Sequence, residues 1–120
     1  GMSIILVSHD MGIVAETSDR VAVMYAGQVV EQADTATIFR NPKHPYTVGL
    51  LNSIPRMESK KERLIPIEGQ PPNLLRLPAG CPFAERCPVA TPDCAETPIA
   101  LREVEPAHFT ACLYPERVSA

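Results

Sequence analysis

Four cysteines in the second half of the chain are the residues whose type and spacing point most directly to chemistry. They are Cys81, Cys87, Cys94 and Cys112, spaced C-x5-C-x6-C-x17-C. Four thiolates from irregular loops can hold a tetrahedral zinc ion or a 4Fe–4S cluster, and either would order a segment with little core of its own. Zinc sites usually contain a tight C-x2-C pair, so the wider spacing favours the larger cluster. Two disulfides, which a cytosolic location disfavours, and four unrelated thiols remain as alternatives.

The three histidines are weaker candidates. His9 stands with Ser8 and Asp10 after a short apolar run, where a partly exposed polar residue at a strand end is ordinary. We expect Asp10 to cap a helix rather than to act as a base, because its carboxylate can accept an unpaired backbone N–H. His44 is expected to cap or hydrogen-bond near a helix start. His108 precedes Cys112 by four residues and could bind a metal, but we expect a solvent-facing loop histidine.

The first forty residues carry regular patterns that would position these groups. The apolar run at residues 3–7 predicts a strand buried on both faces, as in a parallel sheet. Apolar residues at helical spacing predict a helix over Met11–Thr17. Two β-rich runs, Arg20–Tyr25 and residues 28–32, flank an Ala-Gly pair and predict a β-hairpin. A further helix is expected over residues 35–39.

The rest of the chain is less regular. A helix is expected from His44-Pro45-Tyr46 up to Pro55, with Tyr46 on its inner face. Short strands are expected at residues 64–67 and 109–113, and mostly loop from residue 80 onward. Of the 13 prolines, only Pro42 and Pro45 fall in the first fifty residues, and proline disfavours long helices in the second half.

Composition excludes some classes of function. The net charge is −3 and no basic run is present, which argues against binding to nucleic acid. The longest apolar runs are far shorter than the roughly 20 residues of a membrane-spanning helix. No signal peptide is visible, so the cytoplasm is the expected compartment.

Several segments in order resemble one family. The strand, Ser-His-Asp and helix pattern of residues 4–16 resembles the switch-histidine region of ABC ATPases, and residues 18–31 resemble that family's closing hairpin. Residues 38–51 resemble the His-Pro-Tyr extension of oligopeptide, dipeptide and nickel importer ATPases. Residues 67–72 and 80–88, with the later cysteines, resemble the tail of that subfamily.

The resemblance implies an α+β fold, namely a C-terminal fragment of a P-loop ABC ATPase α/β domain plus an irregular cysteine-rich tail. Residues 1–40 would be the end of the ATPase domain, with the switch-histidine strand and the hairpin. Residues 41–120 would be the importer extension with the four-cysteine loops. The resemblance also implies that His9 is the switch histidine, which hydrogen-bonds the γ-phosphate of ATP, and that the cysteines hold an iron–sulfur cluster.

For the parent subunit, the resemblance implies ATP with Mg as cofactor and hydrolysis that powers peptide import. Its partners would be transmembrane permease subunits and a second ATPase subunit at the cytoplasmic face of the cell membrane. The sequence contains no Gly-rich phosphate loop, signature motif or Walker B acid, so we do not expect this chain to hydrolyse ATP alone.

Two further expectations follow. An unpaired strand at residues 3–7 would favour dimerisation or strand swapping of the isolated chain. The rival hypothesis is a stand-alone metal-binding or interaction module, in which His9 is incidental and the cysteines carry the function.

Overall fold

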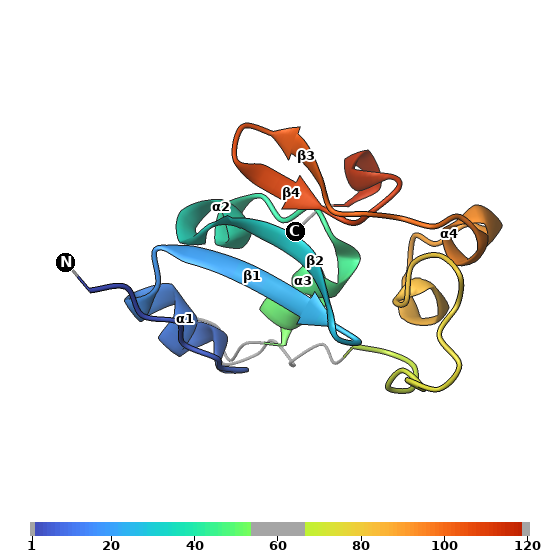
Figure 1. Ribbon diagram of the computed structural model, residues 1–120, viewed down its shortest axis with the longest axis horizontal. Helices are drawn as coiled ribbons and strands as arrows, with labels where there is room; N and C mark the ends of the chain where they lie inside the picture. Colours follow the sequence, from blue (N-terminus) through green and yellow to red (C-terminus); the bar gives the residue numbers. More distant parts are fainter. Residues whose placement is uncertain (1, 54–66, 119–120) are drawn as a thin grey trace, which may run out of the picture.

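A computed structural model describes residues 2–53 and 67–118. The centre of the fold is a hairpin of β1 (Arg20–Tyr25) and β2 (Gln28–Asp34), as the sequence predicts, although β2 runs two residues further than expected (Figure 1). Ala26 and Gly27 form the turn with φ of 52° and 79°, the left-handed pair that lets a two-residue turn follow the twist of its strands.

The C-terminal part of the chain extends this hairpin into one antiparallel sheet, ordered β1-β2-β4-β3. β4 (His108–Thr110) pairs with β2, so that Glu31 lies opposite Thr110, and β3 (Arg102–Glu105) forms the outer edge. The strand predicted near residue 109 is therefore present, but β3 was not predicted. Its Arg-Glu-Val-Glu sequence offers no apolar face, because the strand lies at an exposed edge.

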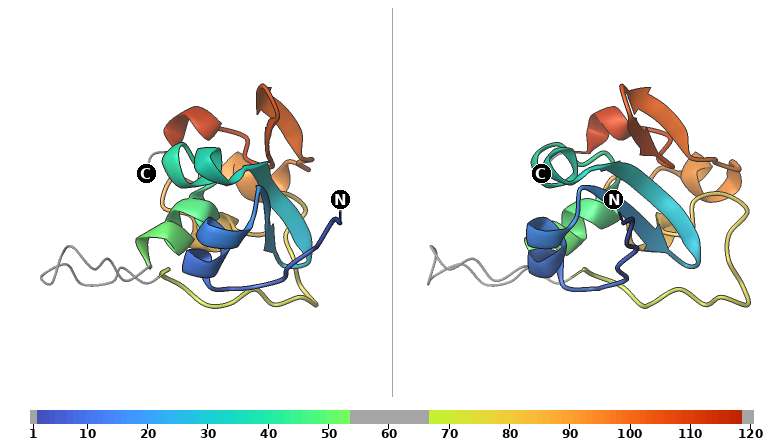
Figure 2. Two further views of the ribbon diagram at one scale, coloured as in Figure 1. Left: turned by 90° about the vertical axis from the view of Figure 1, so that its left-hand side faces the viewer. Right: turned by 60° about the vertical axis from the view of Figure 1, so that its left-hand side comes forward.

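Three helices lie together on one side of the sheet (Figure 2). They are α1 (Met11–Thr17), α2 (Thr35–Arg40) and α3 (Pro45–Asn52). The side chains of Asp10, Asp34 and His44 precede them, and each accepts a hydrogen bond from a backbone N–H in the first turn of its helix. All three helices were predicted, and the capping roles of Asp10 and His44 are confirmed.

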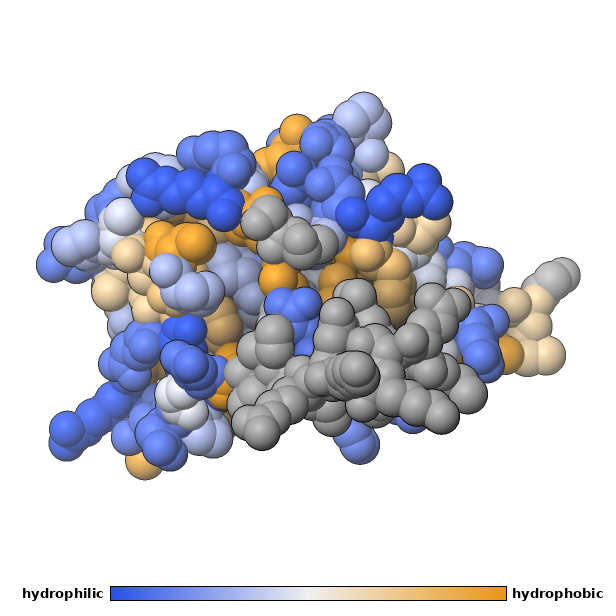
Figure 3. Space-filling view, turned by 180° about the vertical axis from the view of Figure 1, so that it is seen from behind, coloured by the Kyte–Doolittle hydropathy of each residue, from blue (hydrophilic) through white to orange (hydrophobic). Residues whose placement is uncertain are grey.

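The strand predicted at residues 3–7 is not formed. These residues carry no regular structure, and the side chains of Ile4, Ile5 and Val7 are 79–93% exposed. Hydrophobic side chains accordingly mark the protruding N-terminal end of the molecule, at the right of Figure 3. The prediction was wrong because a strand needs a neighbour to take up its backbone hydrogen bonds, and the sheet in the described part of the chain provides none there.

Short helical turns organise the cysteine-rich region. They are η1 (Ala84–Arg86), α4 (Pro92–Glu96) and η2 (Pro115–Arg117). The strand predicted at residues 64–67 lies outside the described residues, apart from Ile67, which is in no strand. Across residues 2–53 and 67–118, no helix has both the length and the apolarity needed to cross a membrane.

An aromatic core joins the hairpin, α3 and the cysteine-rich loops. Phe83, which is 2% exposed, packs with Val23, Tyr25 and Val30. Its ring centroid lies 5.1 Å from that of Tyr25 and 5.4 Å from that of Tyr46, and the two tyrosine rings are 4.7 Å apart. This contact places the loop of Cys81 and Cys87 against α3.

Candidate functional site

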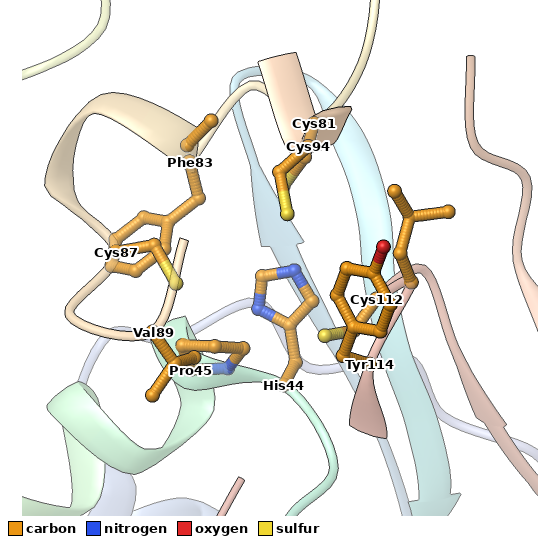
Figure 4. A pocket seen from close by; sticks show the side chains of 11 residues that line it. His44, Pro45, Cys81, Phe83, Cys87, Val89, Cys94, Cys112 and Tyr114 are labelled. Carbon is orange, nitrogen blue, oxygen red and sulfur yellow. The ribbon is translucent and has the colours of Figure 1, made fainter. Parts of the chain in front are cut away.

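All four cysteines line one cavity, although they come from three segments: the loop of Cys81 and Cys87, helix α4, and the chain after β4 (Figure 4). The cavity is small and partly open to solvent. The other lining residues are mostly apolar or aromatic: His44, Pro45, Phe83, Ala84, Val89, Leu113 and Tyr114. The structure thus brings together the complete set of cysteines that the sequence singled out, and adds a histidine to it.

Gly80 allows the first and third cysteines to approach each other. The backbone N–H of Gly80 donates to the Ala95 carbonyl at 2.9 Å, and that of Cys81 donates to the Cys94 carbonyl at 2.7 Å. A Cβ atom at residue 80 would lie 2.3 Å from the Cys94 carbonyl oxygen, well inside van der Waals contact. Only glycine fits this backbone-to-backbone approach.

Arg86 fixes the loop that carries Cys87. Its Nε donates to the Glu68 carbonyl at 3.0 Å, and its Nη2 donates to the Ile67 carbonyl at 3.3 Å. Its Nη1 lies 3.4 Å from the hydroxyl of Tyr25, the residue that packs on Phe83. The guanidinium therefore ties the cysteine loop to the segment before it and to the aromatic core.

Polar contacts also hold the segments of Cys94 and Cys112. The carboxylate of Asp93 in α4 accepts hydrogen bonds from the hydroxyls of Thr91 and Tyr114, which joins the helix of Cys94 to the chain just beyond Cys112. Arg102 in β3 donates from Nη2 to the carbonyl of Cys112 at 3.1 Å. Every cysteine is thus anchored through its own backbone or a close neighbour.

The cavity makes the charged form of the thiols costly. Burial, with a smaller contribution from the neighbouring thiolates, raises the pKa of Cys81 and Cys87, and raises that of Cys112 to about 11. All four cysteines are free, and none forms a disulfide. Cys81, Cys87 and Cys112 are therefore neutral thiols near pH 7, and a bound cationic group would be needed to stabilise them as thiolates.

His44 is the polar side chain that sequence reasoning did not place in this site. It is fully buried, and its Nδ1 accepts the N–H of Tyr46 at 3.1 Å, as expected of a cap. Its Nε2 has no hydrogen-bond partner in the described part of the chain, and in Figure 4 it points toward the side of the cavity where Cys81 and Cys94 lie. Burial lowers the pKa of His44 to about 4, so the ring is neutral. Its place depends on the packing of Phe83, which sequence spacing does not reveal.

The other two histidines lie elsewhere. His9 is exposed in the segment before α1 and does not line the cavity. His108 was expected to face solvent, but this expectation was wrong: it is 1% exposed and its Nε2 lies 2.5 Å from Oε2 of Glu31. The reason is that β4 packs beside β2, where the fully buried Glu31 also accepts the N–H of Lys43 at 2.7 Å.

The four cysteines of the cavity do not form a preformed site for a single metal ion. Among residues 2–53 and 67–118, no three His, Cys, Asp or Glu side chains form a group that could hold a metal ion. An iron–sulfur cubane takes four cysteine thiolates and is larger than one ion, so the number and chemistry of these donors fit it.

The fold and the site together define a small α+β unit in which a hairpin and a cysteine-rich appendage share one sheet. Residues 30–94 match the family described as the oligopeptide/dipeptide transporter, C-terminal region, and the chain belongs to this family.

Curated relatives agree with this assignment. The chain is 46% identical over 113 residues to the oligopeptide transport ATP-binding protein OppD of Escherichia coli, covering 94% of this chain and 33% of the relative. It is 45% identical over 120 residues to OppD of Mycobacterium tuberculosis, covering 99% and 20%. It is 54% identical over 87 residues to the dipeptide transport ATP-binding protein DppD of Bacillus subtilis, covering 72% and 26%. The chain therefore spans a third or less of the length of these relatives.

Proposed function

We propose that this chain is the C-terminal part of an ATP-binding subunit that powers peptide import through an ABC transporter. The observation that carries the proposal is the similarity along 94% of the chain to a protein named as an oligopeptide transport ATP-binding protein. In this account the parent subunit binds ATP with Mg and acts with a second ATPase subunit and transmembrane permease subunits. It works at the cytoplasmic face of the cell membrane.

Residues 1–40 then belong to the end of the ATPase domain, and residues 41–120 form the extension. His9 serves as the switch histidine toward the γ-phosphate. Its exposure in the segment before α1 leaves the imidazole accessible to a nucleotide held by the rest of the parent. One ring nitrogen can donate to a phosphate oxygen while the other accepts from a neighbouring group.

The test uses the full-length parent. His9→Ala is expected to lower ATP hydrolysis at least a hundredfold with little change in ATP affinity, because its hydrogen bond matters most as charge develops on the phosphate. Ser3→Ala, in the same exposed segment, is the matched control and should keep normal hydrolysis. Equal activity of His9→Ala and the control would refute the role of His9.

The exposed apolar residues 3–7 fit the same account. In the parent they would pair as a strand with the remainder of the ATPase domain. In the isolated chain, the unpaired backbone and the exposed Ile4, Ile5 and Val7 favour dimerisation or strand swapping. Sedimentation of the chain should show dimer at micromolar concentration, and Ile5→Lys should shift it to monomer. A monomeric wild-type chain at all concentrations would contradict this part.

We further propose that the four cysteines hold a 4Fe–4S cluster rather than zinc. The shared cavity and the free thiols support this assignment. When bound, such a cluster would supply a one-electron redox couple and a cross-link between three chain segments. The chain's own contribution is to exclude water with Phe83, Val89 and Leu113 and to hold the thiols in place.

Anaerobic purification followed by metal and sulfide analysis tests the cluster, with Ser8→Ala as a matched surface variant. Iron with equal sulfide and a broad visible absorbance are expected. Stoichiometric zinc, or a metal-free protein after anaerobic reconstitution, would contradict the assignment.

The second candidate is a stand-alone metal-binding or interaction module, which the complete cysteine cavity favours. The gene sequence immediately before the codon of residue 1 distinguishes the ATPase subunit from the stand-alone module. A phosphate loop and signature motif encoded in frame upstream support the ATPase subunit, and a native start at Met2 supports the module.

A further inference from the structure

The hydrogen bonding of His44 determines which of its ring nitrogens carries the proton. The backbone N–H of Tyr46 donates to Nδ1 at 3.1 Å, so this nitrogen supplies its lone pair and cannot bear hydrogen. In a neutral imidazole the proton then sits on Nε2. A backbone contact that also caps α3 therefore sets the tautomer of the ring.

The protonated nitrogen faces a cavity with few acceptors. His44 is 0% exposed, its Nε2 has no partner among the described residues, and in the close view it points toward Cys81 and Cys94 (Figure 4). The hydroxyl of Tyr114, which also lines the cavity, donates its proton to the Asp93 carboxylate and does not accept from Nε2 in the described structure. The other side-chain acceptors that line the cavity are the cysteine sulfurs.

The same tautomer excludes His44 as a metal ligand through Nε2. A ligating imidazole needs its lone pair on the metal-bound nitrogen and donates its other N–H to an acceptor. At His44 the other nitrogen meets a donor, the Tyr46 N–H, and not an acceptor. The imidazole ring therefore presents its Nε2–H to the cavity as a hydrogen-bond donor.

We infer that His44 is a further residue of the cysteine site, whose Nε2–H donates a hydrogen bond to a sulfur of the cluster or of its cysteine ligands and so raises the reduction potential. This inference rests on the proposed function of the four cysteines. A donor at sulfur stabilises the more negative, reduced form more than the oxidised form, because hydrogen bonds to charged acceptors are stronger. His44 thereby tunes the site without binding iron.

The test compares two substitutions in the full chain, reconstituted anaerobically with iron and sulfide. His44→Asn keeps a capping acceptor for Tyr46 but is too short to donate into the cavity. His44→Phe keeps the ring volume and loses the donor. Asp34→Asn exchanges one capping acceptor for another at the start of α2, away from the cavity, and is the matched control.

Redox titration followed by electron paramagnetic resonance gives the readout, with the titrant supplying one electron per cluster. Both His44 variants should make reduction about tenfold less favourable, which is about 59 mV for a one-electron couple. The Asp34→Asn control should match wild type. A cluster in His44→Asn with the wild-type potential would overturn the inference and leave the cluster assignment intact.

A wild-type measurement covers the case in which neither variant folds. With histidine labelled in nitrogen-15, the His44 signals should show a proton on Nε2 and a paramagnetic shift in the loaded chain. A proton on Nδ1, or no paramagnetic effect, would overturn the inference. Wild type without iron and sulfide refutes the proposed cluster, and this inference falls with it.

Discussion

The substitution Gly80→Ala is expected to open the cysteine cavity. The added Cβ would lie 2.3 Å from the carbonyl oxygen of Cys94 in α4 and 2.6 Å from that of Thr97, the residue just after this helix. No side-chain rotation can relieve these contacts, so the segment of Cys81 must move away from α4. That movement also strains the hydrogen bonds that the N–H groups of residues 80 and 81 donate to this helix.

The size of the effect follows from these contacts. Overpacking costs about 1–3 kcal/mol, and the backbone clash places Gly80→Ala at the upper end, about 3 kcal/mol. Since 1.4 kcal/mol is a factor of ten, the population with an open cavity should rise by roughly a hundredfold. The assay is the rate at which a thiol reagent labels Cys81 and Cys94 in the metal-free, reduced chain under native conditions.

Gly12→Ala is the matched control. Its Cβ would approach only the flexible carboxylate of Asp10, at 3.2 Å, and it replaces a helical glycine, which should be neutral or slightly stabilising. Faster labelling in Gly80→Ala, with wild-type labelling in Gly12→Ala, is the expected pair of results. Equal labelling rates and equal unfolding midpoints in the two variants would refute the role assigned to Gly80.

Three further predictions concern stability. Phe83→Ala should lower the free energy of unfolding by about 3–5 kcal/mol in urea, because a ring only 2% exposed is removed from the aromatic core; Leu75→Ala, at a 94% exposed side chain, should change it by less than about 0.5 kcal/mol. Glu31→Ala should lower the free energy of unfolding by about 3–5 kcal/mol, because it leaves the buried His108 and the Lys43 N–H without their acceptor. An unfolding midpoint equal to that of wild type would contradict the stabilising role of the Glu31–His108 pair. In the metal-free chain, the pKa of His44 is about 4 when folded and 6.5 when unfolded, so the unfolded state takes up a proton first as pH falls. The contribution of His44 to the free energy of unfolding is therefore complete above pH 6.5, and about 3 kcal/mol of it is lost as the pH falls toward 4. In urea unfolding at a series of pH values, His44→Asn should lack this pH-dependent loss. Identical pH profiles for His44→Asn and wild type would contradict the prediction.

Local chemistry made much of the fold predictable. The hairpin follows from two β-rich runs around a pair that tolerates positive φ, and the helices follow from capping residues and apolar spacing. The strand at residues 3–7 failed for the opposite reason. Its apolar side chains are typical of a buried strand, but the part of the chain that the structure covers offers no neighbouring strand with which it could pair.

Sequence reasoning selected the cysteines that meet at one cavity, but it did not predict the shape of that cavity. The cysteines could be selected from their number and spacing, whereas the sequence could not show that Gly80 and Phe83 help to bring their three segments to one cavity. His44 was correctly expected to cap a helix, but a cap uses only one ring nitrogen. Where the second nitrogen points depends on tertiary packing, as does the burial of His108 against Glu31.

Native mass spectrometry of the anaerobically purified full chain tests the central claim about the cysteine cavity most directly. The account predicts a mass increase equal to about four iron and four sulfide ions per chain, which is lost in Cys94→Ala. An increase equal to one zinc ion, or the same iron content in Cys94→Ala as in wild type, would contradict it.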